Sequence, residues 1–258
     1  MNLKIPGVKF LISSVPLEFD TDEYISRFES GNPRNIDADH IVVLMQPHIQ
    51  RFHMSAISEI SLFDEITLPD KLNIPEIFDE TQNLHGKKIL VFMLNGWGDT
   101  ILIQPALRAF YTMIAATGNP PRMTLGCNWI YNFPYLYAPY IHGVCPNILT
   151  LKKLCSFDIL VNLIPINFQR SPDSSMRDLC LNILNPGPEF GGNDPPSLQP
   201  DPQRISIIKP VLDQIRKKTG KNLLCVNWKS RFHHKNASPQ LFSQVVDTLH
   251  DRYQAVLF

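Results

Sequence analysis

The chain has 258 residues, a length that allows one large domain or two small ones. Hydrophobic residues make up 44% of it and charged residues 19%, with 24 Lys and Arg balanced by 24 Asp and Glu. This is the composition of an ordinary globular chain, and it excludes the broad positive field by which proteins attract nucleic acid or an anionic membrane.

Cysteine and hydropathy patterns indicate an intracellular protein. The cysteine count of 5 is odd and includes no C-x-x-C pair, which favours reduced, mostly buried thiols over a zinc site or a disulfide framework. No apolar run approaches the ~18 residues that a membrane helix requires. Pro6, Pro16 and Glu18 interrupt the apolar patch near the N-terminus, so it lacks the pattern of a signal peptide. We expect a cytoplasmic protein with at most peripheral membrane contact and no nucleic-acid partner.

Residues 1–84 predict a mixed α/β segment. Lys9 to Val15 and His40 to Met45 are apolar enough for short strands. Ile57 to Leu68 alternates apolar and polar residues, as a strand or a hairpin does. Pro69 to Leu84 is polar and predicts irregular structure. No catalytic motif occurs in this segment.

The stretch from Lys87 to Phe110 predicts the opening unit of a Rossmann-like half. Ile89 to Leu94 is a continuous apolar run, typical of a strand buried on both faces in a parallel sheet. Asn95 to Asp99 contains two glycines and predicts a tight turn. From Thr100 on, apolar residues recur at roughly helical spacing, and Pro105 either lies in the first turn of a helix that begins one residue earlier or kinks a longer one. The N–H groups at such a helix start favour an anion or an acidic side chain.

Two nucleotide-binding templates do not fit this turn. Gly96 and Gly98 supply the first two glycines of the dinucleotide fingerprint G-x-G-x-x-G, but Ile101 stands in the place of the third. The next predicted strand, Arg122 to Gly126, is followed by Cys127 rather than by the required carboxylate. A Walker loop of the form G-x-x-x-x-G-K-[ST] does not occur. A Rossmann oxidoreductase and a P-loop NTPase are therefore disfavoured.

The chain up to residue 203 completes the predicted first half. Phe157 to Ile164 predicts a third buried parallel strand, and Ser174 to Leu184 predicts a helix. The aromatic run from Trp129 to Tyr140 fits two interpretations: rings that line a sugar site, or packing of a short segment on the sheet, which we favour. Asn185 to Pro202 is dense in proline and glycine, so we expect a loop or an interdomain linker.

A second strand, loop and helix follow the linker. Ile205 to Lys218 predicts a helix that Pro210 interrupts. Lys221 to Asn227 is another basic-led apolar strand, and Ser238-Pro239 predicts the N-cap and first turn of a helix. Tyr253 to Phe258 reads as a further strand. The strand, loop and helix that begin at Lys221 repeat the order of those that begin at Lys87, which indicates two Rossmann-like halves. The second half is incomplete, so we expect a fragment or a naturally shortened protein.

Gly98-Asp99-Thr100-Ile101-Leu102 and Pro105-Ala106-Leu107-Arg108-Ala109 resemble the opening motif of the heptosyltransferase-like glycosyltransferases, the ADP-heptose:lipopolysaccharide type. In that family a strand ends in a loop carrying Gly-Asp, and a helix with a P-A-L-R-like sequence follows. The resemblance implies the GT-B fold, in which an N-terminal acceptor domain and a C-terminal nucleotide-sugar domain, both Rossmann-like, face each other. It assigns Asp99 as the catalytic base, and we assign its neighbours to substrate binding: Gly96, Trp97, Gly98 and Thr100.

A carboxylate suits that role, because an inverting sugar transfer requires a base that takes the proton from the attacking hydroxyl. Asp99 would lie at the carboxyl end of a parallel strand, where open α/β sheets bind their ligands. Alternatively Asp99 caps its helix, since Asp is a preferred N-cap residue, and the two roles are compatible. In the family, residues after the third strand lie near the acceptor, which makes Asn162 and Asn167 further candidates.

The residues from Trp228 to Phe242 are similar to the start of the family's second domain, a W-K-S-like loop followed by K-x-W-P-x-E-x-F. Ala237 replaces the tryptophan of that pattern. The resemblance implies that Lys235 faces the diphosphate of the donor, and Lys229 and Arg231 add positive charge beside a helix N-terminus. The other interpretation of these three side chains is a solvated basic loop.

Together these patterns predict an α/β protein with three parts: an N-terminal extension at 1–84, a Rossmann-like acceptor domain at 85–203, and the start of the nucleotide-sugar domain at 204–258. The extension departs from the family and would be an acceptor-recognition module or an interaction surface. The resemblance implies a bacterial, inverting transferase, independent of metal and cofactor, in lipopolysaccharide biosynthesis. It would move a heptose-like sugar from a nucleotide-diphosphate donor to a lipopolysaccharide-like, lipid-linked or other saccharide acceptor. The alternative is an inactive truncated homologue that acts as a binding or scaffold protein.

Overall fold

The computed structural model describes residues 2–12, 41–45, 62–68, 72–93, 97–127, 135, 138–145, 148–168, 175–191, 194–196, 202–226 and 238–257. The chain forms two units, Met1–Gln199 and Pro200–Phe258. Each unit contains parallel strands of its own.

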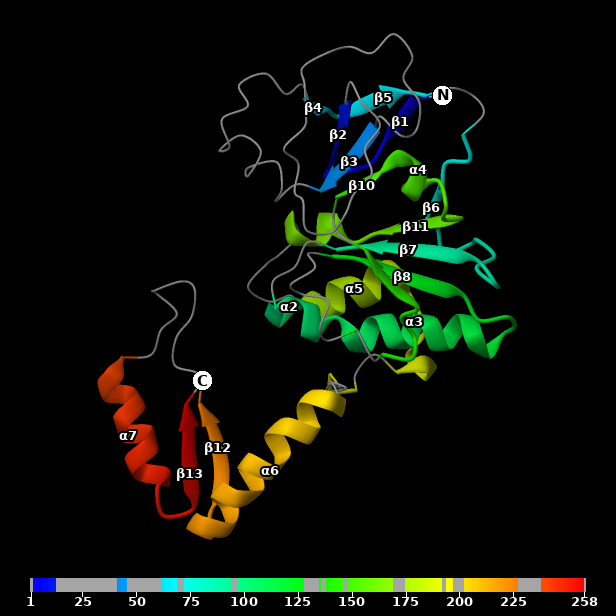
Figure 1. The fold of residues 1–258 in the computed structure, drawn as a ribbon. Helices are drawn as coiled ribbons and strands as arrows, with labels where there is room; N and C mark the ends of the chain where they lie inside the picture. The colour runs from blue at the N-terminus through cyan, green and yellow to red at the C-terminus, as the bar shows by residue number, and fades with distance from the viewer. Residues whose placement is uncertain are drawn as a thin grey trace. The chain divides into compact units, whose positions relative to one another are not determined.

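A five-stranded parallel sheet with the order β6-β11-β7-β8-β9 lies at the centre of the first unit (Figure 1). Its strands are β6 (Glu76–Ile77), β7 (Lys88–Phe92), β8 (Arg122–Gly126), β9 (Gly143–Cys145) and β11 (Ile159–Asn162). The three long strands are those that the apolar runs predict. All of Ile89 to Phe92 is buried, because both faces of the sheet are covered.

Two helices cover one face of this sheet, α3 (Gln104–Ala116) and α5 (Met176–Leu184) (Figure 1). Leu107 and Phe110 of α3 share a buried cluster with alternate residues of β7, Ile89 and Val91. The sequence predicts α5 correctly, and the hydroxyl of Ser175 accepts a hydrogen bond of 3.1 Å from the Asp178 amide as an N-cap does.

An antiparallel layer covers the other face (Figure 1). Leu90, Phe92 and Leu160 of the parallel sheet share a buried cluster with this layer. It contains a four-stranded sheet of order β10-β3-β2-β4 and a two-stranded sheet of β1 and β5. Its elements are β1 (Asn2–Lys4), β2 (Val8–Ile12), β3 (Ile41–Met45), β4 (Leu62–Phe63), β5 (Glu65–Thr67), β10 (Ile148–Thr150) and the adjoining helix α4 (Leu151–Leu154).

The segment 1–84 therefore contributes strands to all three sheets described in the first unit. The strands predicted at Lys9 to Val15 and His40 to Met45 correspond to β2 and β3. Ile57 to Leu68 contains two strands that do not form a hairpin with each other, because β4 pairs with β2 and β5 pairs with β1. Pro69 to Leu84, expected to be irregular, adds β6 at the edge of the parallel sheet. A separate domain with a boundary at residue 84 stays a prediction.

The second unit contains α6 (Pro202–Thr219), β12 (Asn222–Val226), α7 (Pro239–Leu249) and β13 (Tyr253–Leu257). β12 and β13 are parallel, with α7 between them in the chain. The hydroxyl of Ser238 accepts a hydrogen bond of 3.1 Å from the Leu241 amide, so the predicted N-cap is confirmed. The predicted interruption of α6 at Pro210 is wrong: the helix continues through it, since a proline removes one backbone donor and its neighbours keep theirs.

The predicted fold class is confirmed, with a Rossmann-like parallel sheet in the first unit and a single β-α-β element in the second. In the part of the chain that the structure describes, no helix is long and apolar enough to cross a membrane.

Candidate active site

The order of strands defines where a ligand is expected on the parallel sheet. From β7 the chain proceeds outward to β8 and β9, and then returns to the other side of β7 with β11. The reversal lies between β7 and β11, and α/β sheets bind ligands outside the carboxyl ends of the strands at such a point. The Leu163 amide donates a 2.9 Å hydrogen bond to the carbonyl of Phe92, so the two strand ends lie side by side.

Asp99 follows the carboxyl end of β7. It is half-buried in the first turn of α2 (Trp97–Leu102), and its carbonyl accepts a hydrogen bond of 3.1 Å from the Ile103 amide. A carboxylate in the first turn of a helix is favoured by the helix dipole.

The structure corrects the predicted backbone at this point. Trp97, Gly98 and Asp99 are helical, so they are not part of a turn that extends to Asp99. Asp99 is the third residue of α2, which puts it inside the helix rather than at the N-cap. Gly98 adopts a helical conformation that any residue tolerates, so the freedom of glycine is not required there. Gly96 lies outside the described residues.

Thr100 is fully buried beside Asp99. Its carbonyl oxygen accepts a hydrogen bond of 2.6 Å from the hydroxyl of Tyr135. Tyr135 and Tyr140 belong to the buried cluster under α3, so the packing interpretation of the aromatic run is confirmed for these two rings. A substrate-binding role for Thr100 stays a prediction, as it does for Gly96, Trp97 and Gly98.

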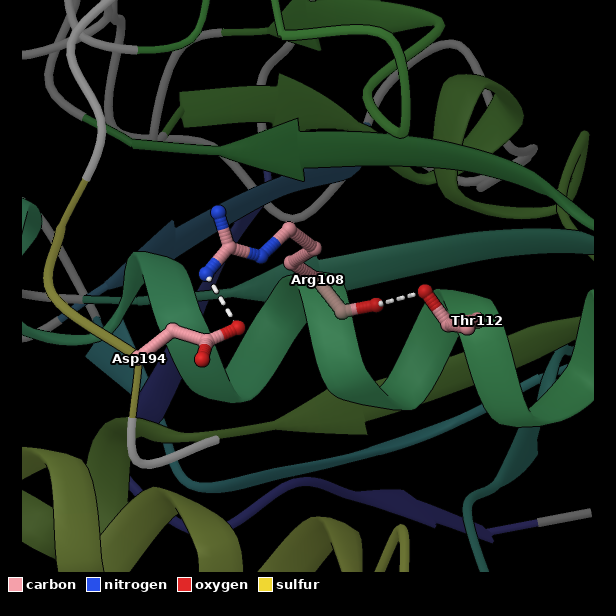
Figure 2. Close-up of polar contacts among 3 residues, drawn as sticks. All are labelled: Arg108, Thr112 and Asp194. Atoms are coloured by element: carbon pink, nitrogen blue, oxygen red, sulfur yellow. Dashed lines mark hydrogen bonds and ion pairs between the residues drawn. The ribbon is translucent and has the colours of Figure 1, made fainter. Parts of the chain in front are cut away.

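The P-A-L-R motif at the start of α3 is explained by packing and by one ion pair. α2 and α3 are separate helices, and Pro105 lies in the first turn of α3, as the first of the two predicted alternatives requires. Pro105, Ala106, Leu107 and Ala109 are buried against the sheet. Arg108 points the other way, and its Nη2 lies 3.0 Å from Oδ2 of Asp194 (Figure 2). Arg108 thus contacts the segment that follows α5 in the chain.

Asn162 lies at the end of β11, and both the nitrogen and the oxygen of its side-chain amide form hydrogen bonds. Its Nδ2 donates a hydrogen bond of 2.9 Å to the carbonyl of Pro6, and its Oδ1 accepts one of 3.1 Å from the Ile164 amide. These bonds fix the start of the 3₁₀ segment η3 (Ile164–Phe168). Asn167 lies within η3. Their acceptor-binding roles stay predictions.

The predicted diphosphate-binding residues Lys229, Arg231 and Lys235 lie outside the described residues. The described residues contain no group of three or more His, Cys, Asp and Glu side chains placed to hold a metal ion. The sequence interpretation missed the Tyr135–Thr100 bond and the Asn162–Pro6 bond, because each depends on a contact between distant segments.

No protein-family model matches the chain, and no curated protein matches it in sequence. A solved structure shares its fold. It is the crystal structure of the glycosyl transferase family 9 protein from Veillonella parvula DSM 2008. The two superpose with a TM-score of 0.51 and 16% sequence identity, over 69% of this chain and 64% of that chain. The match thus spans less than two thirds of the Veillonella chain, and at this identity it shows a common fold.

Proposed function

We propose that this chain is a glycosyltransferase, or a part of one, that moves a sugar from a nucleotide-diphosphate donor to a saccharide acceptor with Asp99 as the catalytic base. One observation carries the proposal: a half-buried carboxylate lies in the first turn of α2, the helix that follows β7 in the chain, and β7 is the strand at which the order of the sheet reverses. The fold that the chain has in common with the Veillonella protein, which is named a glycosyl transferase, supports the same reaction class.

In the proposed reaction the acceptor hydroxyl oxygen forms a bond to the anomeric carbon of the donor sugar. The bond from that carbon to the diphosphate oxygen breaks, and its electron pair leaves with the nucleoside diphosphate. Asp99 takes the proton of the attacking hydroxyl, as general-base catalysis requires. Lys229, Arg231 and Lys235 supply positive charge to the leaving diphosphate.

Finer features of the proposal rest on the sequence alone. These are inversion at the anomeric carbon, independence from metal, a heptose-like sugar, a lipopolysaccharide-like acceptor and a bacterial, cytoplasmic setting. They specify which donors and acceptors an assay has to include.

The test measures release of nucleoside diphosphate and transfer to acceptor. The chain is incubated with ADP-, UDP- and GDP-sugars, ADP-heptose among them, and with a lipopolysaccharide preparation or short saccharides. Asp99→Asn is expected to lower the transfer rate by about 10²- to 10⁴-fold, the usual contribution of a general base.

Asp178→Asn is the matched control, since Asp178 also lies in the first turn of a helix, α5, where its carboxylate pairs with Arg177. It is expected to retain the wild-type rate. Near-normal transfer by Asp99→Asn would contradict the base role. Absence of transfer by the folded wild-type chain with every donor would contradict the proposed function, and binding of a donor without its turnover would favour the scaffold alternative.

A further inference from the structure

The link between α2 and α3 depends on a side chain from another part of the chain. Asp99 and Thr100 are adjacent in α2, and their carbonyls are held in two different ways. The carbonyl of Asp99 accepts from the Ile103 amide at 3.1 Å, whereas that of Thr100 accepts from the phenol of Tyr135 at 2.6 Å. The second bond crosses 35 residues of sequence. α2 is therefore attached both to its own chain and to the segment after β8.

This attachment lies at a weak point of the helical segment. α2 ends at Leu102 and α3 begins at Gln104, so a single residue separates them. Pro105 has no N–H and cannot donate to the carbonyl four residues before it. Six residues are too few for α2 to be stable by its own hydrogen bonds, so its position depends on tertiary contacts.

The Tyr135–Thr100 bond is well placed to supply such a contact. The Tyr135 side chain is 1% exposed and Thr100 is 0% exposed. Loss of a hydrogen bond between buried groups lowers stability more than loss of an exposed one, because water does not replace the missing partner. Burial raises the pKa of the Tyr135 hydroxyl well above its usual value, with Tyr140, Cys127 and Cys180 adding to the effect. The phenol consequently keeps its proton and remains a donor at all physiological pH values.

We propose that Tyr135 is a positioning residue: its hydroxyl bond to the Thr100 carbonyl fixes α2, and with it the direction in which the adjacent Asp99 carboxylate points. The part of this inference that concerns catalysis rests on the proposed function, in which Asp99 is the base. Displacement of a catalytic group by about 1 Å lowers the rate of the catalysed reaction by up to about 10²-fold. Loss of the Tyr135–Thr100 hydrogen bond should therefore lower turnover.

The first test needs no substrate. Tyr135→Phe removes the hydroxyl and keeps the ring. Tyr140→Phe is its matched control, since Tyr140 is buried in the same cluster and its hydroxyl does not bond Thr100. In hydrogen exchange of the full chain, the amides of residues 99–104 are expected to exchange about 3- to 10-fold faster in Tyr135→Phe, the effect of one net hydrogen bond on local opening. The control is expected to leave them unchanged. Unchanged exchange in Tyr135→Phe, or equal acceleration in both variants, would overturn the proposal.

The second test separates positioning from general stability. With ADP-, UDP- and GDP-sugars as donors, Tyr135→Phe is expected to lower kcat by about 10- to 100-fold while the KM for the donor stays within about twofold of the wild-type value. Circular dichroism at the assay temperature confirms that the variant is folded. A wild-type kcat in Tyr135→Phe beside an inactive Asp99→Asn would overturn the positioning role and leave the base role intact. If Asp99→Asn is fully active, the base role fails and with it the catalytic part of this inference, and the exchange measurement still decides whether Tyr135 holds α2.

Discussion

The side-chain amide of Asn162 donates a 2.9 Å hydrogen bond to the carbonyl oxygen of Pro6, across 156 residues of sequence. Pro6 lies in the turn between β1 and β2, and Asn162 ends β11. The bond attaches the N-terminal antiparallel layer to the parallel sheet at the strand ends that flank the candidate active site. The first two predictions test this attachment.

Asn162→Ala is expected to lower the free energy of unfolding of the chain by about 1–3 kcal/mol, because it leaves the Pro6 carbonyl and the Ile164 amide without the partner they have now. Asn162→Asp keeps an acceptor for Ile164 but replaces the donor to Pro6 by a carboxylate oxygen, which repels the Pro6 carbonyl. Urea denaturation followed by tryptophan fluorescence measures both variants. A loss below about 0.5 kcal/mol in Asn162→Ala, the level of an ordinary surface substitution, would show that the attachment contributes little.

Gly7→Ala is expected to destabilise the first unit by about 2–4 kcal/mol, since backbone strain and overpacking add. Gly7 has a φ of +76°, and a Cβ there would overlap Cγ2 of Ile164 in η3. Gly86→Ala is the matched control. Gly86 has a φ of +67°, but the nearest atom to its added Cβ is Nδ2 of Asn119 at 3.5 Å. Gly86→Ala is expected to lower the free energy of unfolding by about 1 kcal/mol, because only backbone strain is added. Equal losses in the two variants would mean that Ile164 moves aside freely.

The Arg108–Asp194 ion pair is expected to contribute little to stability despite its good geometry. Its side chains are 34% and 63% exposed, and exposed ion pairs are worth about 0–1 kcal/mol. Asp194→Asn should therefore lower the free energy of unfolding by less than about 1 kcal/mol, and the difference should shrink in 1 M NaCl. Thermal denaturation at low and high salt measures it. A loss of several kcal/mol that persists in salt would indicate that Arg108 has a larger role in holding this segment.

Three buried thiols are expected to make the first unit sensitive to alkaline pH. Burial raises the pKa of Cys127, Cys145 and Cys180 to about 12 each, from 9 for an ordinary thiol. Between pH 9 and 12 the unfolded chain releases these protons and the folded chain keeps them. Stability is thus fully present below pH 9 and falls as the pH rises, by roughly 1 kcal/mol per pH unit for each thiol.

Urea denaturation at pH 8, 9 and 10 measures this slope. At pH 8, mass spectrometry after iodoacetamide treatment should find Cys155 labelled faster than Cys127, Cys145 and Cys180, because Cys155 is only partly buried. Stability that is constant up to pH 10, or rapid labelling of Cys180, would show that these thiols are accessible.

Pro210→Ala is expected to stabilise the second unit. Pro210 lies in the middle of α6, where it removes a backbone hydrogen bond and costs up to about 3 kcal/mol relative to alanine. Far-UV circular dichroism should show more helix, and the thermal midpoint of the second unit should rise. Lys217→Ala, at an exposed position of the same helix, controls for a general gain in helix propensity. A lower midpoint in Pro210→Ala would show that the proline side chain contributes to packing.

The sequence by itself determined the features that depend on a few neighbouring residues. Mainly apolar runs specified the strands β7 and β11, and Ser238 specified a helix start through a bond to the amide three residues on. The family resemblance of the motif after β7 made Asp99 the candidate base, a role that stays a prediction.

Only the tertiary structure decided what covers each face of that sheet and what holds its active-site edge. The antiparallel layer pairs β3 with β10, more than 100 residues apart, and β6 joins the parallel sheet through two residues that have no apolar periodicity. The helical state of Trp97 to Asp99 and the bond from Tyr135 to Thr100 also depend on distant segments. Local patterns encode the hydrogen bonds and burial of one element, whereas these contacts arise when separate elements pack and satisfy each other's backbone groups.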